Sequence, residues 1–163
     1  MKSITNIFSV VLTAILVAAT VSAAAARFTV TESTPDEPVV TDMATGRMWQ
    51  QGSTLEGPVT WSGALEHCES LMYAGHEDWR LPSINELLSI VDEKKEAEPA
   101  VNTTFFSGFD TFSGLWTSTT HRKQFQSAYV VYFNEQNTTV GRGGVGGHSK
   151  TFTAHALCVR TNR

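Results

Sequence analysis

The two cysteines of this chain, Cys68 and Cys158, constrain its fold more than any other feature. A disulfide between them would close a loop of about 90 residues, for which chain-entropy estimates give roughly 4–5 kcal/mol of stabilisation. Such a bridge persists in oxidising compartments and is rare in the cytosol. A catalytic or metal-binding thiol is the alternative, although the sequence has no CxxC pair and no histidine at a metal-ligand spacing. The compartment therefore decides how the cysteines are interpreted.

The first 26 residues indicate export. Lys2 supplies a basic start, residues 7–21 are almost wholly apolar, and small residues fill 21–26, as in a secretory signal peptide. An uncleaved anchor is the alternative, because about 20 apolar residues span a bilayer. Small and polar residues dilute the stretch, so we expect cleavage, no membrane span in the mature chain, and a periplasmic, cell-surface or secreted location. There the even cysteine pair predicts a disulfide.

The rest of the chain is predicted to hold an N-terminal extension, 27–37, and one domain, 38–163. Alternating apolar residues predict a strand over 27–34, which is broken where the prolines begin. A hairpin follows over 39–49, with its turn at Thr45-Gly46.

Two helices are predicted next. Apolar residues at three- and four-residue steps favour a helix that begins at Thr60 and stops at Gly75. Ser83 and Glu86 form an S-x-x-E capping box for a second helix, which is expected to end before Pro99.

The last third alternates strands and loops. The predicted strands cover 114–120, 127–133, 138–142 and 153–160, and the predicted loop covers 143–150. A hairpin, two helices and then several strands predict an α+β fold.

Five segments together resemble the Lcl C-terminal domain family, which is named for the end domain of a collagen-like bacterial adhesin. The segments are 40–49 (VTDMATGRMW), 60–68 (TWSGALEHC), 78–87 (DWRLPSINEL), 115–120 (LWTSTT) and 158–160 (CVR). Each segment alone is weak, but their order and spacing match over nearly the whole mature chain.

The resemblance implies a C-type-lectin-like fold, related to the formylglycine-generating sulfatase-modifying enzymes. Such a fold has a small twisted antiparallel sheet, two helices, long loops and one disulfide. It also implies that Cys68 in the first helix pairs with Cys158 in the last strand. The relatives that generate formylglycine use a cysteine site, so an enzyme of that kind is the less favoured alternative for a chain whose two cysteines are paired.

Most of the bulky residues are expected to be structural. Arg80 could contact a ligand, but such an arginine more often ties loop carbonyls or a carboxylate. Trp49, Trp61 and Trp79 are expected in the core, whereas Trp116 precedes a Thr/Ser-rich segment and is kept as a candidate ligand contact.

No enzyme or cofactor motif stands out. The sequence has no G-x-S-x-G, H-E-x-x-H, P-loop or Rossmann fingerprint, and the glycine-rich 141–147 is expected to be a flexible connection. The calcium motif of sugar-binding C-type lectins is missing as well, since 98–100 reads EPA. His76, Glu77 and Asp78 are adjacent and are expected to be solvated rather than metal-binding. We expect no enzyme activity and no cofactor.

Charge divides the chain into two unlike parts. Residues 27–110 carry five basic and fifteen acidic side chains, whereas 111–163 carry six basic side chains and Glu135 alone. If the late loops converge, they form a cationic surface. The candidate ligand-binding residues are His121, Arg122, Lys123, Arg142, His148 and Lys150, with Trp116.

The sequence therefore predicts an exported, non-catalytic binding or adhesion-type domain. Its basic surface favours an anionic, sulfated polysaccharide, which is also the ligand class that the resemblance implies. An extracellular or envelope protein partner is the alternative, and an oligomer is compatible with either. Overall acidity and export exclude nucleic acid as the expected partner.

Overall fold

The computed structural model describes residues 26–32, 36–92, 94–95, 99–107, 114–134 and 143–161. The expected signal peptide up to residue 25 and the expected strand over 138–142 lie outside these ranges. No helix among the described residues is long and apolar enough to cross a bilayer.

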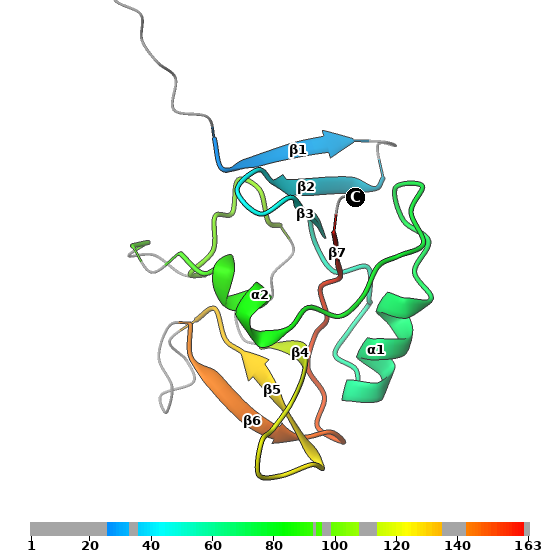
Figure 1. The fold of residues 1–163 in the computed structure, drawn as a ribbon, viewed down its shortest axis with the longest axis vertical. Helices are drawn as coiled ribbons and strands as arrows, with labels where there is room; N and C mark the ends of the chain where they lie inside the picture. The colour runs from blue at the N-terminus through cyan, green and yellow to red at the C-terminus, as the bar shows by residue number, and fades with distance from the viewer. Residues whose placement is uncertain are drawn as a thin grey trace, which may run out of the picture.

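The predicted hairpin lies at the centre of a four-stranded antiparallel sheet. Its strands are β1 (Phe28–Glu32), β2 (Pro38–Asp42), β3 (Arg47–Gln50) and β7 (Val159–Thr161), in the order β1-β2-β3-β7 (Figure 1). The turn between β2 and β3 uses Gly46 at a φ of +69°, a left-handed conformation that glycine adopts without a steric penalty. β1 belongs to the segment expected as an extension, and it adds the outer strand to this sheet.

A second antiparallel sheet contains β4 (Leu115–Thr120), β5 (Ser127–Val131) and β6 (Val145–Ser149). The expectation of a loop over 143–150 was wrong, because β6 occupies most of that range. Its glycines do not form a flexible connection; they leave space for two histidine rings that pack against the strand. A Cβ on Gly146 would stand 2.8 Å from Nε2 of His148, and one on Gly147 would stand 2.9 Å from Cδ2 of His121.

Both predicted helices form, but each is shorter than expected. α1 (Trp61–Glu69) is capped by Thr60, and α2 (Ile84–Ser89) begins with the predicted capping box. α1 ends early because the following residues make a tight turn in which Tyr73 and His76 exchange backbone hydrogen bonds of 3.1 and 3.0 Å. α2 ends early because the chain returns to pair Val91 with Val101.

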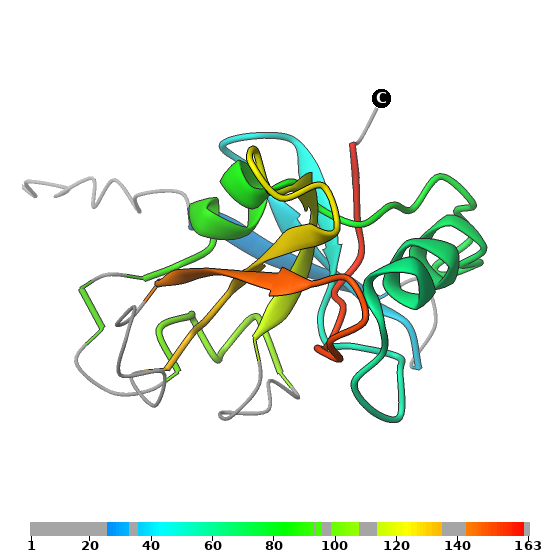
Figure 2. The ribbon, with the colours of Figure 1, turned by 90° about the horizontal axis from the view of Figure 1, so that it is seen from below.

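The expected final strand over 153–160 is mostly an extended connection between the two sheets. Ala154 forms a bridge with Val59, and His155 forms one with Leu115 of β4. Only then does the chain enter β7, beside β3. Figures 1 and 2 show this closing segment running from the β4–β5–β6 sheet to the β1–β2–β3–β7 sheet, past α1.

Tryptophans and the disulfide form the interior. Trp49 and Trp79 are buried as predicted, and Trp116 is buried too, whereas Trp61 is half-buried. Two apolar clusters result. One contains the disulfide with Trp79 and Trp116, and the other contains Trp49 and Leu87.

Candidate functional site

The turn between β4 and β5 presents two of the predicted cations. Arg122 and Lys123 are both exposed. The ends of the turn are fixed by two hydrogen bonds of 2.8 Å, from the backbone N–H of His121 to the Ser127 carbonyl and from the Ser127 N–H to the Gln124 carbonyl. Because the ends are held, the two cations stay at one end of the sheet.

Lys150 reaches the same end from the neighbouring strand. Its backbone N–H donates to the Gln126 carbonyl at 2.8 Å, immediately before β5. Its ammonium lies 3.9 Å from the centroid of the Trp61 ring, a cation–π contact. Trp61 is fixed in turn, since its indole N–H donates to the Thr117 carbonyl at 2.8 Å.

We call Arg122, Lys123 and Lys150 the basic end. Within the described part of the chain, none of these three side chains forms an ion pair with a carboxylate. Their charge is therefore available to a ligand.

The two histidines of the predicted set lie on opposite faces of the sheet. Gly147 pairs with Tyr129, and the His121 ring lies over both, 5.0 Å from the Tyr129 ring centroid. His148 pairs with Ala128, one residue along, and successive residues of a strand point to opposite faces. The candidate histidines therefore do not converge on one ligand.

His148 is also a poor source of charge. Its Nε2 lies 2.6 Å from the Tyr132 hydroxyl, and its ring stacks on Phe152 with centroids 4.5 Å apart. Burial lowers the pKa of His148 below its ordinary value, so the ring is neutral near pH 7. We therefore leave it out of the basic end.

Of the two remaining candidates, Trp116 does not add to the surface. Trp116 is 0% exposed, and its indole N–H donates to the Val59 carbonyl at 2.9 Å, so this residue is part of the core. A buried side chain cannot contact a surface ligand, and Trp116 is excluded from the site for that reason. Arg142 lies outside the described residues.

Sequence reasoning missed two aromatic residues at the basic end. Phe125 belongs to the turn with Arg122 and Lys123 and is 77% exposed. Phe152 follows Lys150 and is 44% exposed. An aromatic residue among polar residues in an expected turn was the available signal for Phe125, whereas nothing in the sequence distinguishes an exposed Phe152 from a core one.

Arg80 has the structural role that was favoured for it. Its guanidinium forms two hydrogen bonds to the Glu86 carboxylate, at 2.7 and 2.9 Å, and Arg47 adds a third at 3.0 Å. Hydrogen bonds from Arg80 and from Ser83 lower the pKa of Glu86 to about 2. Both arginines thus bind the one Glu86 carboxylate, which fixes their guanidinium groups in the fold.

The polar triplet His76, Glu77 and Asp78 follows α1 in a loop. Asp78 accepts hydrogen bonds from Arg160 at 2.6 and 3.3 Å, while His76 and Glu77 line a small hollow that also contains Glu37 and Met72. Among the residues that the structure describes, no group of three or more histidine, cysteine or acidic side chains is arranged to hold a metal ion.

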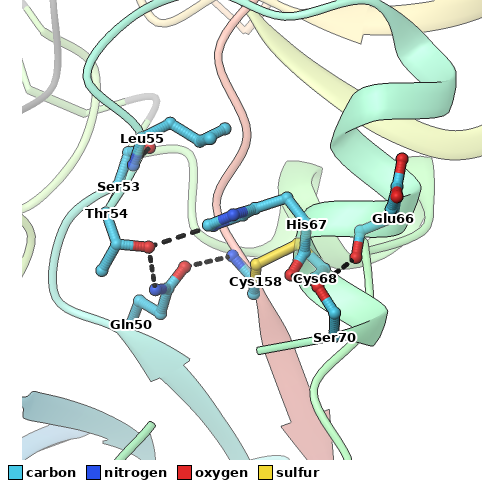
Figure 3. Close-up of a disulfide and its surroundings, with 9 residues drawn as sticks. All are labelled: Gln50, Ser53, Thr54, Leu55, Glu66, His67, Cys68, Ser70 and Cys158. Atoms are coloured by element: carbon cyan, nitrogen blue, oxygen red, sulfur yellow. Dashed lines mark hydrogen bonds between the residues drawn. A yellow bond between two sulfur atoms is a disulfide. The ribbon is translucent and has the colours of Figure 1, made fainter. Parts of the chain in front are cut away.

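The cysteines form the predicted disulfide, and both are fully buried (Figure 3). The alternative of a reactive thiol is therefore wrong. Beside the bridge, the Cys158 N–H donates to Oε1 of the buried Gln50 at 2.9 Å. Nε2 of Gln50 donates to Thr54 at 3.2 Å, and the Thr54 hydroxyl lies 3.0 Å from Nε2 of His67 on α1. This chain of hydrogen bonds links β3, α1 and Cys158, the residue just before β7.

Comparison with known proteins agrees with the geometry. The family model described as the Lcl C-terminal domain matches residues 38–160, which is most of the chain. No curated protein matches it. The matched range begins at the first residue of β2 and ends within β7, and it includes both cysteines, both helices and the basic end. This chain belongs to the Lcl C-terminal domain family.

Proposed function

We propose that this protein is an exported, non-catalytic module that binds anionic polysaccharides, and sulfated ones in particular, through the basic end of its second sheet. The observation that carries the proposal is the meeting of Arg122, Lys123 and Lys150 at one end of β4, β5 and β6 without a carboxylate partner among the described residues. Cations that the fold does not neutralise attract a polyanion at moderate salt.

Most of the other basic side chains of the described residues support this choice of surface by contrast, the exposed Lys94 being the exception. Arg27, Arg47, Arg80 and Arg160 each pair with a carboxylate, and Lys95 donates to the carbonyls of Pro99 and Val101. Most basic side chains of residues 27–110 are thus bound to acceptors within the fold, and that part of the chain is strongly acidic overall.

Export is part of the proposal. A disulfide buried in the core supports folding in an oxidising compartment, where such bridges persist. The absence of catalysis is likewise proposed, because both cysteines are bonded and buried. A cysteine-centred site of the kind used to generate formylglycine therefore has no thiol to use.

Retention on immobilised heparin tests the proposal. We expect the mature wild-type domain to bind, and to elute earlier when sodium chloride is raised, because salt screens exposed charges. The double variant R122A/K123A should elute at markedly lower salt and show a weaker salt dependence. The matched control is K94A, which removes one exposed lysine outside the basic end and should elute with the wild type, whereas K123A alone should not.

Two results would count against the proposal. One is a wild-type domain that flows through the column at low salt. The other is an equal shift for K123A and K94A, which would mean that net charge and not the basic end governs retention.

A protein partner is the second candidate function, and one observation favours it. Met72 is 72% exposed at the rim of the hollow that contains Glu37, His76 and Glu77, on the part of the chain away from the basic end. An exposed apolar side chain beside carboxylates suits a protein surface with a complementary basic residue. Binding of that kind would be lost in M72D but not in R122A/K123A.

A further inference from the structure

Two exposed phenylalanines flank the basic end from neighbouring turns. Phe125 precedes Gln126, whose carbonyl accepts the Lys150 N–H at 2.8 Å. Phe152 follows two residues after Lys150, and its own N–H donates to the Ser149 carbonyl at 2.8 Å. The turn between β4 and β5 and the end of β6 thus lie side by side at the same end of the sheet (Figures 1 and 2).

The Phe152 ring is held in place although it is partly exposed. One face stacks on His148, with the rings inclined by 25°, and the ring meets Trp116 edge-on with centroids 6.2 Å apart. His148 is anchored by the Tyr132 hydroxyl, and Trp116 by the Val59 carbonyl. An aromatic ring fixed in this way loses little conformational entropy when a ligand covers its open side.

Phe125 is the most exposed large apolar side chain among the described residues. Its ring makes no aromatic contact with any other described residue. A solvated phenyl ring gains free energy when apolar surface covers it. Three cations without a carboxylate partner and two exposed aromatic rings therefore lie on adjoining turns at one end of the sheet, and charge recognition alone explains only the cations.

We propose that Phe125 and Phe152 bind the uncharged faces of sugar rings, while Arg122, Lys123 and Lys150 bind the sulfate or carboxylate groups of the same chain. This inference rests on the proposed function and makes it narrower. A pyranose ring has an apolar C–H face that an aromatic ring can cover, and a polyphosphate has none. The two phenylalanines thus determine specificity, making the site selective for anionic polysaccharides over other polyanions of equal charge.

The test compares two polyanions on the same variants. Heparin supplies sugar rings and sulfates, whereas linear inorganic polyphosphate supplies charge without rings. We expect F125A to weaken heparin binding about five-fold at fixed salt, which corresponds to about 1 kcal/mol. We expect F125A to leave the slope of affinity against salt unchanged and polyphosphate binding within two-fold of wild type. F152L should act in the same direction.

Matched controls separate the aromatic contribution from loss of folding. M43A removes another exposed apolar side chain, 62% exposed in the turn between β2 and β3, and should bind both polyanions like the wild type. Phe125 makes no ring contact with the described residues, so F125A should retain the wild-type unfolding temperature. F152L is compared at matched folded fraction, because that ring packs against Trp116.

The outcomes also distinguish this inference from the proposed function. If R122A/K123A loses heparin binding and F125A binds heparin like wild type, the aromatic inference is overturned and the basic end stands. Equal losses of F125A on heparin and polyphosphate overturn it as well. So does a loss on phosphatidylglycerol vesicles without a loss on heparin, which would indicate insertion of Phe125 into a lipid surface. If R122A/K123A binds heparin like wild type, the proposed function itself fails.

Discussion

Glu86 joins three segments of the chain through one carboxylate. It is 8% exposed and accepts hydrogen bonds from Arg80, Arg47 and the Ser83 backbone and hydroxyl. The sequence predicted its place in the capping box and predicted that Arg80 would bind either loop carbonyls or a carboxylate. It did not predict that the two residues would meet, because nothing in a linear pattern shows which carboxylate an arginine reaches.

Replacing Glu86 with glutamine should therefore destabilise the domain near neutral pH. We expect E86Q to lower the free energy of unfolding by about 2 kcal/mol at pH 7, since charge-assisted hydrogen bonds become neutral ones and Arg80 is partly solvated. Chemical denaturation measures this change. E66Q removes an exposed carboxylate on α1 and should stay within about 0.5 kcal/mol of wild type.

The pH dependence of the same pair of proteins has a defined sign. The folded-state pKa of Glu86 is lowered from 4.5 to about 2, so its contribution is complete above pH 4.5 and is lost as the pH falls towards 2. The stability difference between wild type and E86Q should shrink over that window, when followed by denaturation at several pH values. A difference that stays constant from pH 7 to pH 2 would contradict the assignment.

The histidines and Trp116 mark the limit of prediction at this scale. Residue type suggested that His121 and His148 could add charge to a common surface, but strand alternation separates them and burial keeps His148 neutral. Trp116 was kept as a surface candidate because its neighbours are polar, and it lies in the core. Burial is a property of tertiary packing, so neighbouring residues in the sequence could not show which of these side chains lie at the surface. The ligand roles of Arg122, Lys123 and Lys150 stay predictions.

At the scale of elements, local signals gave the starts of helices and strands better than their ends. The capping residues Thr60 and Ser83 both act as expected, because N-caps are local hydrogen-bond patterns. The ends were set by distant partners, such as Val101 pairing with Val91 just after α2. In the same way β6 was mistaken for a loop. A glycine-rich sequence favours a loop, and it does not reveal that distant aromatic rings pack against these glycines.

Gly114 lies just before β4 and close to Val130 of β5, which gives a prediction for this position. A Cβ at this position would stand 2.1 Å from Cγ1 of Val130 and 3.0 Å from the Tyr132 ring. We expect G114A to lower the free energy of unfolding by about 1–3 kcal/mol, the usual cost of overpacking a core. Thermal and chemical unfolding measure it.

G57A is the matched control for that variant. A Cβ on Gly57 meets nothing within 4 Å, so the same added methyl should change stability by less than about 0.5 kcal/mol. Equal effects of G57A and G114A would mean that backbone flexibility, and not the contact between the strands, determines the result.

On the scale of the whole molecule, the disulfide fastens α1 to the closing segment that joins both sheets. Its two cysteines are 90 residues apart in sequence, so the bridge restricts most of the unfolded domain. We expect C68A/C158A to lower the free energy of unfolding by about 3–5 kcal/mol, mainly because the unfolded chain gains entropy. Denaturant unfolding of the variant and of the reduced wild type should give similar midpoints. A loss below about 1 kcal/mol would show that the bridge adds little to the packing around it.

The sequence by itself determined the fold class, the order of the helices and most strands, the disulfide and the family, because these follow from periodicity, capping patterns, cysteine count and motifs in a fixed order. Tertiary structure decided which side chains meet: the basic end, the pairing of Arg80 with Glu86, the separation of the histidines and the exposure of Phe125 and Phe152. The physical reason is that charge and polarity are properties of a residue, whereas burial, strand register and the neutralisation of a charge depend on contacts between residues far apart in the chain.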